Sequence, residues 1–184
     1  MSSQQPAGLV TLGHGSLTTE ALVALLRGAQ VATVVDIRRY PGSRRHPHLA
    51  RVALEQQLPA AGVGYRWEED LGGRRRAPAD PETDGWWQVE QFRGYASHTR
   101  SPQFARALER LLAECRAEPV AVMCSEAVWW RCHRRLVADV VALTSDIPVR
   151  HLGHDGRLRE HPVADGARVV AGQVVWDRPQ PGSR

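Results

Sequence analysis

Hydrophobic positions along this chain follow two periodicities in turn. Short apolar or β-branched runs are typical of buried strands, and apolar residues at helical spacing are typical of helices that cover a sheet. The runs expected as strands lie at residues 9–12, 32–37, 63–67, 120–123 and 148–152. The patterns expected as helices lie at about 18–29, 48–58, 101–115 and 130–143. Strands that alternate with helices predict an α/β fold with a mostly parallel central sheet flanked by helices.

The C-terminal part of the chain departs from this alternation. A turn at Asp155-Gly156 and a β-branched run at residues 168–175 predict a C-terminal hairpin or an edge strand. A chain of 184 residues suits one domain rather than two. We therefore expect a single domain over residues 9–176, with flexible ends at 1–8 and 177–184.

Two internal segments are harder to assign. Residues 72–84 combine proline and glycine with three consecutive arginines, which predicts a long loop and leaves open whether it acts as a lid. Residues 86–95 fit neither periodicity clearly, so the sequence leaves their structure open.

Composition excludes few classes of protein. No apolar run approaches the roughly 20 residues that a membrane span needs, and the first eight residues lack the features of a secretory signal. The three cysteines do not form a disulfide framework, and in a reducing compartment they are expected as thiols. We therefore expect a cytoplasmic protein without a membrane partner, and leave its oligomeric state open.

The charge of the chain comes from arginine. The net charge is +4, and the chain contains no lysine. Arginine is suited to bidentate binding of anions and to stacking on rings. Arginines gather at residues 38–45 and 74–76. One interpretation is a solvated basic face, and the other is an anionic partner, either a small molecule that carries phosphate or a nucleic acid.

Polar and reactive residues follow several of the predicted strands. His14 and Ser16 come after the first strand, Asp36 and Arg38 end the second, and residues 124–126 follow the fourth. Ligands of open parallel sheets bind beyond the carboxyl ends of the strands. We therefore expect one functional site at this edge of the sheet.

The segment 123–135 carries the strongest local motif, with a strand end, a loop and a helix start. A helix N-terminus offers free N–H groups and a partial positive charge, which both stabilise a thiolate. Cys124 is the better candidate for a reactive thiol, and Cys132 is equally well explained as a small buried residue. Glu126 fits a general acid or base, or an acceptor for a ligand N–H or an arginine. An ion pair between Glu126 and a nearby arginine is the alternative.

A metal ion remains open as a cofactor, although none is predicted. Cys124, Cys132, His133 and His14 are ligand types, but no Cys-x-x-Cys or His-Glu-x-x-His pattern is present. Neighbouring residues on a helix point about 100° apart, given 3.6 residues per turn. If the helix begins near Trp130, Cys132 and His133 are not expected to bind one ion together.

Six short motifs occur in order along the chain. They are Thr11–Ser16, Val35–Arg38, Pro41–Arg44, Leu71–Gly73, Phe92–Ala96, and Cys124–Glu126 with Arg131–Arg134. Together they resemble the family of the domain of unknown function 488 (DUF488), over about residues 10–176. The resemblance implies a compact α/β domain with its signature residues on one side of the sheet. Related proteins often carry Asp-Pro where this chain has Ala127-Val128, so the resemblance does not extend to the shape of this loop.

The motifs complete the expected site. The residues expected to act chemically are Cys124, Glu126, Cys132 and His133. Those expected to bind the substrate are His14, Ser16, Asp36, Arg38, Ser43, Arg44, Tyr95, Trp130, Arg131 and Arg134. The chain is also loosely similar to rhodanese-like sulfurtransferases, which place a cysteine on a loop held by a helix N-terminus. That similarity implies that Cys124 is a sulfur-carrying thiol.

Three functions are compatible with these observations. The first is a thiol-dependent transferase or hydrolase that acts on an anionic small molecule or nucleotide-like substrate, with Cys132 as a resolving thiol. The second is a protein that binds nucleic acid or processes a nucleobase, with arginines on phosphates and a tryptophan on a base. The third is a metal protein that holds iron or zinc in the Cys/His cluster. We favour an enzyme, because cysteine, glutamate, histidine and aspartate converge on one predicted edge.

Overall fold

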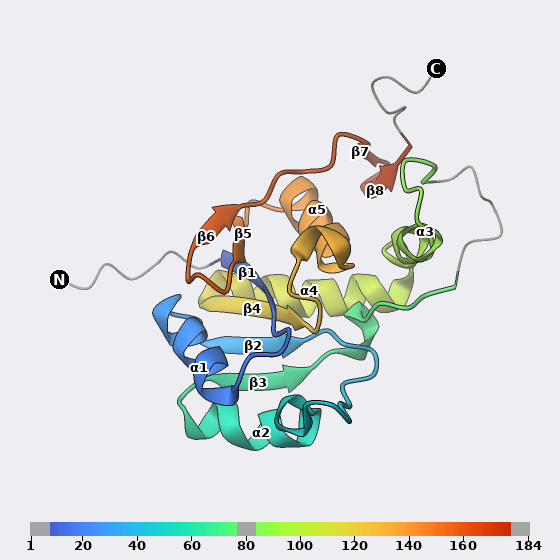
Figure 1. Ribbon diagram of the computed structural model, residues 1–184. Coiled ribbons are helices and arrows are strands. Elements are labelled where there is room, and N and C mark those ends of the chain that lie inside the picture. Colours follow the sequence, from blue (N-terminus) through green and yellow to red (C-terminus); the bar gives the residue numbers. More distant parts are fainter. Residues whose placement is uncertain (1–7, 77–83, 178–184) are drawn as a thin grey trace.

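A twisted, mostly parallel sheet forms the centre of the molecule (Figure 1). The computed structural model describes residues 8–76 and 84–177. Within these residues the strand order of the sheet is β3-β2-β4-β1-β5-β6. The strands are β1 (Gly8–Gly13), β2 (Thr33–Asp36), β3 (Gly64–Trp67), β4 (Pro119–Cys124), β5 (Val149–Leu152) and β6 (Leu158–Glu160). Only β6 pairs antiparallel, so the predicted mostly parallel sheet is confirmed.

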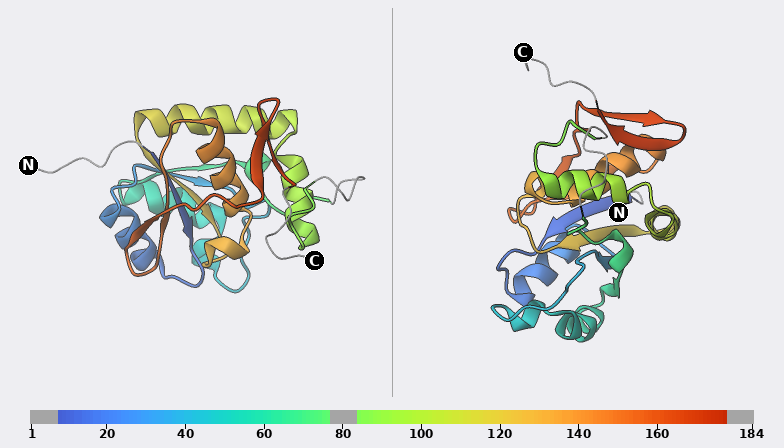
Figure 2. Two further views of the ribbon diagram at one scale, coloured as in Figure 1. Left: turned by 90° about the horizontal axis from the view of Figure 1, so that it is seen from above. Right: turned by 90° about the vertical axis from the view of Figure 1, so that its right-hand side faces the viewer.

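Helices cover both faces of this sheet (Figure 2). The helices are α1 (Thr19–Gly28), α2 (Arg51–Ala60), α3 (Glu90–His98), α4 (Pro102–Ala117) and α5 (Arg134–Thr144). The first two pack on one face, and the last three pack on the other. Side chains of β4 alternate between the two cores: Val120 and Val122 face α4 and α5, and Ala121 and Met123 face α1 and α2. A strand buried on both faces explains the continuous apolar run in the sequence.

Two of the helices begin where the sequence predicts. Thr18 caps α1 by accepting a hydrogen bond from the backbone N–H of Ala21, over 3.2 Å. Ser101 caps α4 in the same way for Phe104, and Pro102 takes the first position of that helix. Residues 86–95, which the sequence left open, contain the start of α3.

The start of α5 corrects a prediction. The helix begins at Arg134 rather than near Trp130, and Trp129–Arg131 form a separate 3₁₀ turn, η3. Cys132 between them has an extended backbone, with φ −123° and ψ 150°. The ring of Trp129 stacks on His151 of β5 with centroids 4.0 Å apart, which holds the turn against the sheet. Local sequence carries no signal for that long-range contact.

The C-terminal hairpin is confirmed. Strands β7 (Ala167–Val170) and β8 (Gln173–Trp176) pair antiparallel, and Trp176 is buried against α5. Gly8, expected in a flexible end, is the first residue of β1. Asp177 forms an ion pair with Arg168, with nitrogen and oxygen 2.5 Å apart. The rest of the expected flexible ends lies outside the described residues, as do residues 77–83 of the expected loop.

A buried chain of hydrogen bonds crosses the molecule from β8 to β1. Asp139 on α5 accepts from the indole N–H of Trp176 over 2.8 Å and from Nε2 of His161 over 2.8 Å. Nδ1 of His161 lies 2.9 Å from Nε2 of His151, and Nδ1 of His151 lies 2.6 Å from the hydroxyl of Thr11. All of these side chains are buried.

The carboxylate fixes one proton in this chain of hydrogen bonds. Asp139 can only accept, so His161 carries a proton on Nε2. With a neutral His161, its Nδ1 accepts, His151 donates from Nε2, and Thr11 donates its hydroxyl hydrogen to Nδ1 of His151. Burial, followed by the nearby His161 and Arg134, lowers the pKa of His151 to about 3.

This arrangement predicts that acid destabilises the fold through His151. Its pKa is lowered from 6.5 to about 3, so between these values the unfolded chain binds a proton that the folded chain does not. The free energy of unfolding should fall as pH decreases through this window, by up to about 1.4 kcal/mol per pH unit from this group. In His151→Gln the pH dependence, measured by urea denaturation, should be shallower by about one proton. An equal slope in both proteins would contradict the assignment.

Candidate functional site

A polar cavity of about 410 Å³ opens beyond the carboxyl ends of β1, β2 and β4. Loops after these strands, α3, and residues 131–133 just before α5 contribute its walls. Its lining residues are His14, Arg38, Arg39, Tyr40, Gly42, Ser43, Gly73, Arg74, Gln91, Phe92, Tyr95, Cys124, Ser125, Glu126, Arg131, Cys132 and His133. The cavity lies at the edge of the sheet where the strand-end rule places a ligand site.

Cys124 is the last residue of β4, in the middle of the sheet. It pairs with Gly13 of β1. The backbone N–H of His14 donates to the Cys124 carbonyl, and that of Gly15 donates to the Ser125 carbonyl, each over 2.9 Å. The loops after β1 and β4 therefore run together. Gly13 is required because a Cβ there would collide with the carbonyl of Glu126.

The buried guanidinium of Arg134 holds the loop after Cys124. It donates to the carbonyl oxygen of Glu126 and to the hydroxyl of Thr11, the second over 3.2 Å. Only 1% of Arg134 is exposed. The side chain of Glu126 accepts from the backbone N–H of Val128 over 2.9 Å and so supports the same loop. Arg134 therefore positions the loop and does not line the cavity.

His133 places one ring nitrogen between two sulfurs. Its Nε2 lies 3.2 Å from the carbonyl oxygen of Ile37, which can only accept, so Nε2 carries the proton. In the neutral imidazole Nδ1 is then unprotonated, and it lies 3.5 Å from Sγ of Cys132 and 4.0 Å from Sγ of Cys124. A lone pair on Nδ1 is therefore available to accept a proton from either thiol.

Two neighbours hold the imidazole of His133 in this orientation. The ring of Tyr95 lies 4.9 Å from it between centroids, and the Tyr95 hydroxyl donates to the carbonyl of Leu71 over 2.6 Å. On another side the backbone of Gly73 approaches so closely that a Cβ there would lie 2.8 Å from Nδ1. The ring has little room to turn away from the sulfurs.

The two thiols differ in acidity. A hydrogen bond from the Cys132 thiol lowers the pKa of Cys124 well below its ordinary value. The hydrogen bond with His133, and the positive charge of that ring when it is protonated, act in the same direction against burial. Burial raises the pKa of Cys132 well above its ordinary value, and the neighbouring Cys124 raises it further. Cys124 is therefore the thiol that ionises first.

Asp36 and Arg38 form a buried ion pair beneath the cavity. Nη2 of Arg38 lies 2.5 Å from the Asp36 carboxylate, and its Nη1 donates to the carbonyl of Leu49 over 2.8 Å. Nη1 also lies 3.2 Å from Nε2 of His14, whose Nδ1 lies 2.9 Å from the carbonyl of Gly15. Burial and Arg38 lower the pKa of His14, so its imidazole is neutral. The contacts of Arg38 with Asp36 and His14 connect the carboxyl end of β2 to the loop after β1.

Of the other residues expected to bind substrate, some line the cavity and others lie on the protein surface away from it. Ser43, Tyr95 and Arg131 line the cavity, whereas Ser16, Arg44 and Trp130 are exposed and do not line it. The hydroxyl of Ser43 accepts from the backbone N–H of His46 over 2.9 Å, so it also shapes its own loop.

The sequence reasoning missed part of the wall. Arg39 and Arg74 line the cavity, and their place in the two arginine clusters was the available signal. Gln91 and Phe92 were missed because α3 had no clear periodicity. Together with Arg131, the two arginines make the rim basic, and within the described residues none of the three forms an ion pair.

The Cys/His cluster is compact enough to hold a metal ion. Sγ of Cys124, Sγ of Cys132 and Nδ1 of His133 lie within 4.8 Å of one another, and His14 does not belong to this group. The expectation that Cys132 and His133 point apart is wrong, because Cys132 is extended and His133 is the N-cap of α5, so the two are not successive residues inside a helix.

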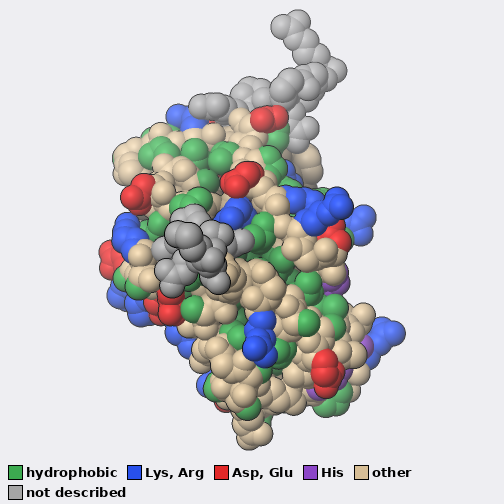
Figure 3. Space-filling view, turned by 90° about the vertical axis from the view of Figure 1, so that its left-hand side faces the viewer, with side chains coloured by type: hydrophobic (Ala, Val, Ile, Leu, Met, Phe, Trp, Pro, Cys, Tyr) green, Lys and Arg blue, Asp and Glu red, His purple; other side chains and the backbone are tan. Residues whose placement is uncertain are grey.

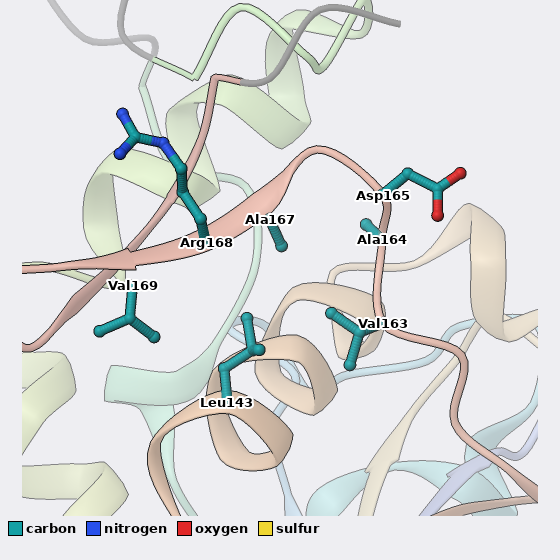
Figure 4. Close-up of a pocket in the computed structure, with 7 residues that line it drawn as sticks. All are labelled: Leu143, Val163, Ala164, Asp165, Ala167, Arg168 and Val169. Atoms are coloured by element: carbon teal, nitrogen blue, oxygen red, sulfur yellow. The ribbon is translucent and has the colours of Figure 1, made fainter. Parts of the chain in front are cut away.

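Other parts of the surface offer less chemistry. A second hollow lies between α5 and the hairpin, where Leu143 and Val163 face each other and Arg168 and Asp165 point away (Figure 4). No thiol or imidazole lines it. On the face that Figure 3 shows, arginine and acidic side chains are interspersed, so that face has no continuous basic surface. No helix in the described parts of the chain is long and apolar enough to cross a membrane.

Comparison with known proteins adds the family. The sequence model described as "Domain of unknown function DUF488" matches residues 18–141, more than half of the chain. The matched span contains Cys124, Cys132 and His133. Thr11, His151 and His161, which form part of the buried series of hydrogen bonds, lie outside it. Searches of curated proteins and of solved structures returned no significant match.

The contact between Gly73 and His133 yields a test of the imidazole position. In Gly73→Ala the new Cβ must displace the ring, because it would lie 2.8 Å from Nδ1 and 3.1 Å from Cγ. We expect alkylation of Cys124 at neutral pH to slow by about tenfold, as for a rise of one unit in thiol pKa. Gly42→Ala is the matched control, because Gly42 also lines the cavity but has open space around its Cβ position. Equal rates in the two variants would exclude the proposed contact as a determinant of Cys124 reactivity.

Proposed function

The chain belongs to the DUF488 family, and we propose that it is an enzyme that acts on an anionic small molecule through the thiol of Cys124. One observation carries this proposal: the unprotonated Nδ1 of His133 faces Cys124 and Cys132, because the carbonyl of Ile37 fixes the proton on Nε2. A cysteine beside an oriented proton acceptor is the arrangement that activates a thiol nucleophile.

The roles of the residues follow from this geometry. Cys124 loses its proton and attacks a ligand in the cavity that it lines. His133 accepts that proton on Nδ1 and returns it to the leaving group. The hydrogen bond to Ile37 holds the imidazole and stabilises the imidazolium when it forms. This sequence of events suits a transferase or a hydrolase, including transfer of sulfur.

The rim of the cavity supports an anionic substrate. Arg39, Arg74 and Arg131 line it, and Nε of Arg39 is buried and has no hydrogen-bond partner among the residues that the structure describes. A buried donor of this kind is costly unless a ligand or water satisfies it. Glu126 also lines the cavity, but it is engaged in its own loop through Val128. The cavity volume of about 410 Å³ suits a small molecule.

A second candidate function is a metal site. The specific observation is that three donor atoms of soft and borderline type converge within 4.8 Å. A histidine ligand usually donates its other ring N–H to a carbonyl or carboxylate, as His133 does to Ile37. Two cysteines and one histidine would leave a fourth position facing the cavity, which suits zinc or iron.

One experiment separates the two candidates. Protein purified without chelator is analysed for metal, and the alkylation rate of each cysteine is then followed against pH by peptide mass mapping. For a thiol enzyme we expect metal-free protein in which Cys124 still alkylates rapidly below pH 7. Its thiolate is lost only as pH falls through its lowered pKa. Cys115 is the internal reference, because burial raises its pKa to about 12 and it should stay unmodified.

Variants make this test decisive. His133→Gln removes the proton acceptor and should slow alkylation of Cys124, while circular dichroism reports whether the fold persists. Stoichiometric zinc or iron that protects Cys124 and Cys132 until a chelator is added would support the metal site and overturn the thiol proposal. Slow alkylation without metal would overturn both.

A further inference from the structure

We propose that Cys124 and Cys132 act as a dithiol pair, and that the substrate is an anionic molecule containing a sulfur–sulfur bond. This inference rests on the proposed function, since it requires Cys124 to be the nucleophile. It assigns a chemical task to Cys132 and narrows the substrate to disulfides and persulfides.

The placement of Cys132 is the first argument. Its sulfur lies within 4.8 Å of the Cys124 sulfur, and only 4% and 7% of the two residues are exposed. Cys132 lies between η3 and α5 and has an extended backbone. Its N–H donates to the carbonyl of Trp129 over 3.1 Å and its carbonyl accepts from the N–H of Arg135 over 3.0 Å, so its sulfur reaches Cys124 by rotation of the side chain. A bond between the sulfurs requires their approach to about 2.0 Å.

The shared imidazole is the second argument. Nδ1 of His133 lies 3.5 Å from one sulfur and 4.0 Å from the other, so a single proton acceptor serves both thiols in turn. A buried thiol that only filled space would not need such an acceptor. Cys115 provides the contrast within this chain: it is buried on the apolar face of α4, and its sulfur has no imidazole partner among the described residues.

The chemistry of a second thiol restricts the substrate. In the first step the Cys124 thiolate attacks one sulfur of R–S–S–R′, a Cys124–S–R bond forms, and R′–S⁻ leaves. In the second step Cys132 gives its proton to Nδ1 of His133 and attacks the Cys124 sulfur, which releases R–S⁻. The substrate is reduced to two thiols and the protein dithiol is oxidised to a disulfide. A low-molecular-weight thiol must then reduce the protein for the next cycle.

Attack by Cys132 releases the bound group only when that group is attached to Cys124 through a second sulfur atom. Attack by Cys132 on the Cys124 sulfur displaces a thiolate readily, but it cannot displace a carbon group from a thioether or remove an acyl group by forming a disulfide. A neighbouring thiol is therefore useful when the intermediate on Cys124 is a mixed disulfide or a persulfide. The basic rim formed by Arg39, Arg74 and Arg131 adds the preference for a negative charge.

Two small disulfides of opposite charge provide the probes. Reduced, metal-free protein is mixed with dithiodiglycolate, a dianion, or with cystamine, a dication, and intact mass is followed with time. In the wild type we expect loss of two hydrogens and a Cys124–Cys132 disulfide, with only a transient adduct. In Cys132→Ser, and in Cys132→Ala as a second variant, the mixed disulfide on Cys124 should persist. Cys115→Ala should behave like the wild type.

The charge preference is measured as a ratio of rates. Relative to a free model thiol, we expect the dianion to react at least about tenfold faster than the dication, as focusing of charge in a cleft allows. Arg131→Gln should reduce this ratio. Equal relative rates for the two probes would overturn the anionic substrate class.

Other outcomes separate this inference from the proposed function. If Cys124 alkylates rapidly but the wild type retains the mixed disulfide as Cys132→Ser does, the dithiol pair is overturned and Cys124 remains the nucleophile. If Cys124 neither alkylates nor exchanges with either probe, the proposed function fails as well.

Discussion

The candidate site depends on one buried guanidinium. Arg134 begins α5, and its side chain reaches across the end of the sheet to the carbonyl of Glu126 and the hydroxyl of Thr11. It thereby joins the helix, β1 and the loop after β4 at the point where Cys124 lies. A buried positive charge is costly unless it is neutralised or hydrogen-bonded. Here no carboxylate contacts it within the described residues, so hydrogen bonds must supply the compensation. The loop cannot move away from β1 without leaving those donors unsatisfied.

The buried hydrogen bonds through His151 and His161 link the Arg134 guanidinium to the carboxylate of Asp139 on the same helix. The Thr11 hydroxyl accepts a hydrogen bond from Arg134 and donates one to Nδ1 of His151. This series of hydrogen bonds ends at the carboxylate of Asp139. Each group donates to the next one along these hydrogen bonds, so the bond dipoles align from the Arg134 cation to the Asp139 anion on α5. A neutral His151 is a condition of this alignment, because its Nδ1 must accept the hydroxyl hydrogen of Thr11. The order of the site loop is therefore coupled to the protonation of groups outside the cavity.

Much of the fold follows from local sequence, whereas the site's exact contacts do not. The strands, α1, α4 and the hairpin were predictable because each has a clear periodicity or a capping residue. The edge that carries Cys124 was predictable because parallel strands bring their carboxyl ends together. The start of α5 was not, since Trp129 is held by stacking on His151, a partner distant in sequence. That single difference leaves Cys132 extended and places His133 at the N-cap of α5 rather than inside the helix. Similarly, the sequence suggests that Arg38 and Arg134 bind an anionic ligand. Only the structure reveals that Arg38 pairs with Asp36 and that Arg134 donates to the carbonyl of Glu126.

The inequivalence of the two cysteines follows from their backbones. Cys124 ends β4, a strand paired on both sides, and itself pairs with Gly13 of β1, whereas Cys132 has an extended backbone at the end of a turn. One lone pair on His133 serves both sulfurs, so the two thiols cannot both donate to it with full strength. The Cys132 thiol instead donates to Cys124, which stabilises a thiolate on the Cys124 sulfur and keeps the proton on the Cys132 sulfur. An attacking group gains from being held rigidly against the ligand, whereas the Cys132 sulfur must approach Cys124 to about 2.0 Å to form a disulfide. The geometry thus matches the order in which the two thiols would act.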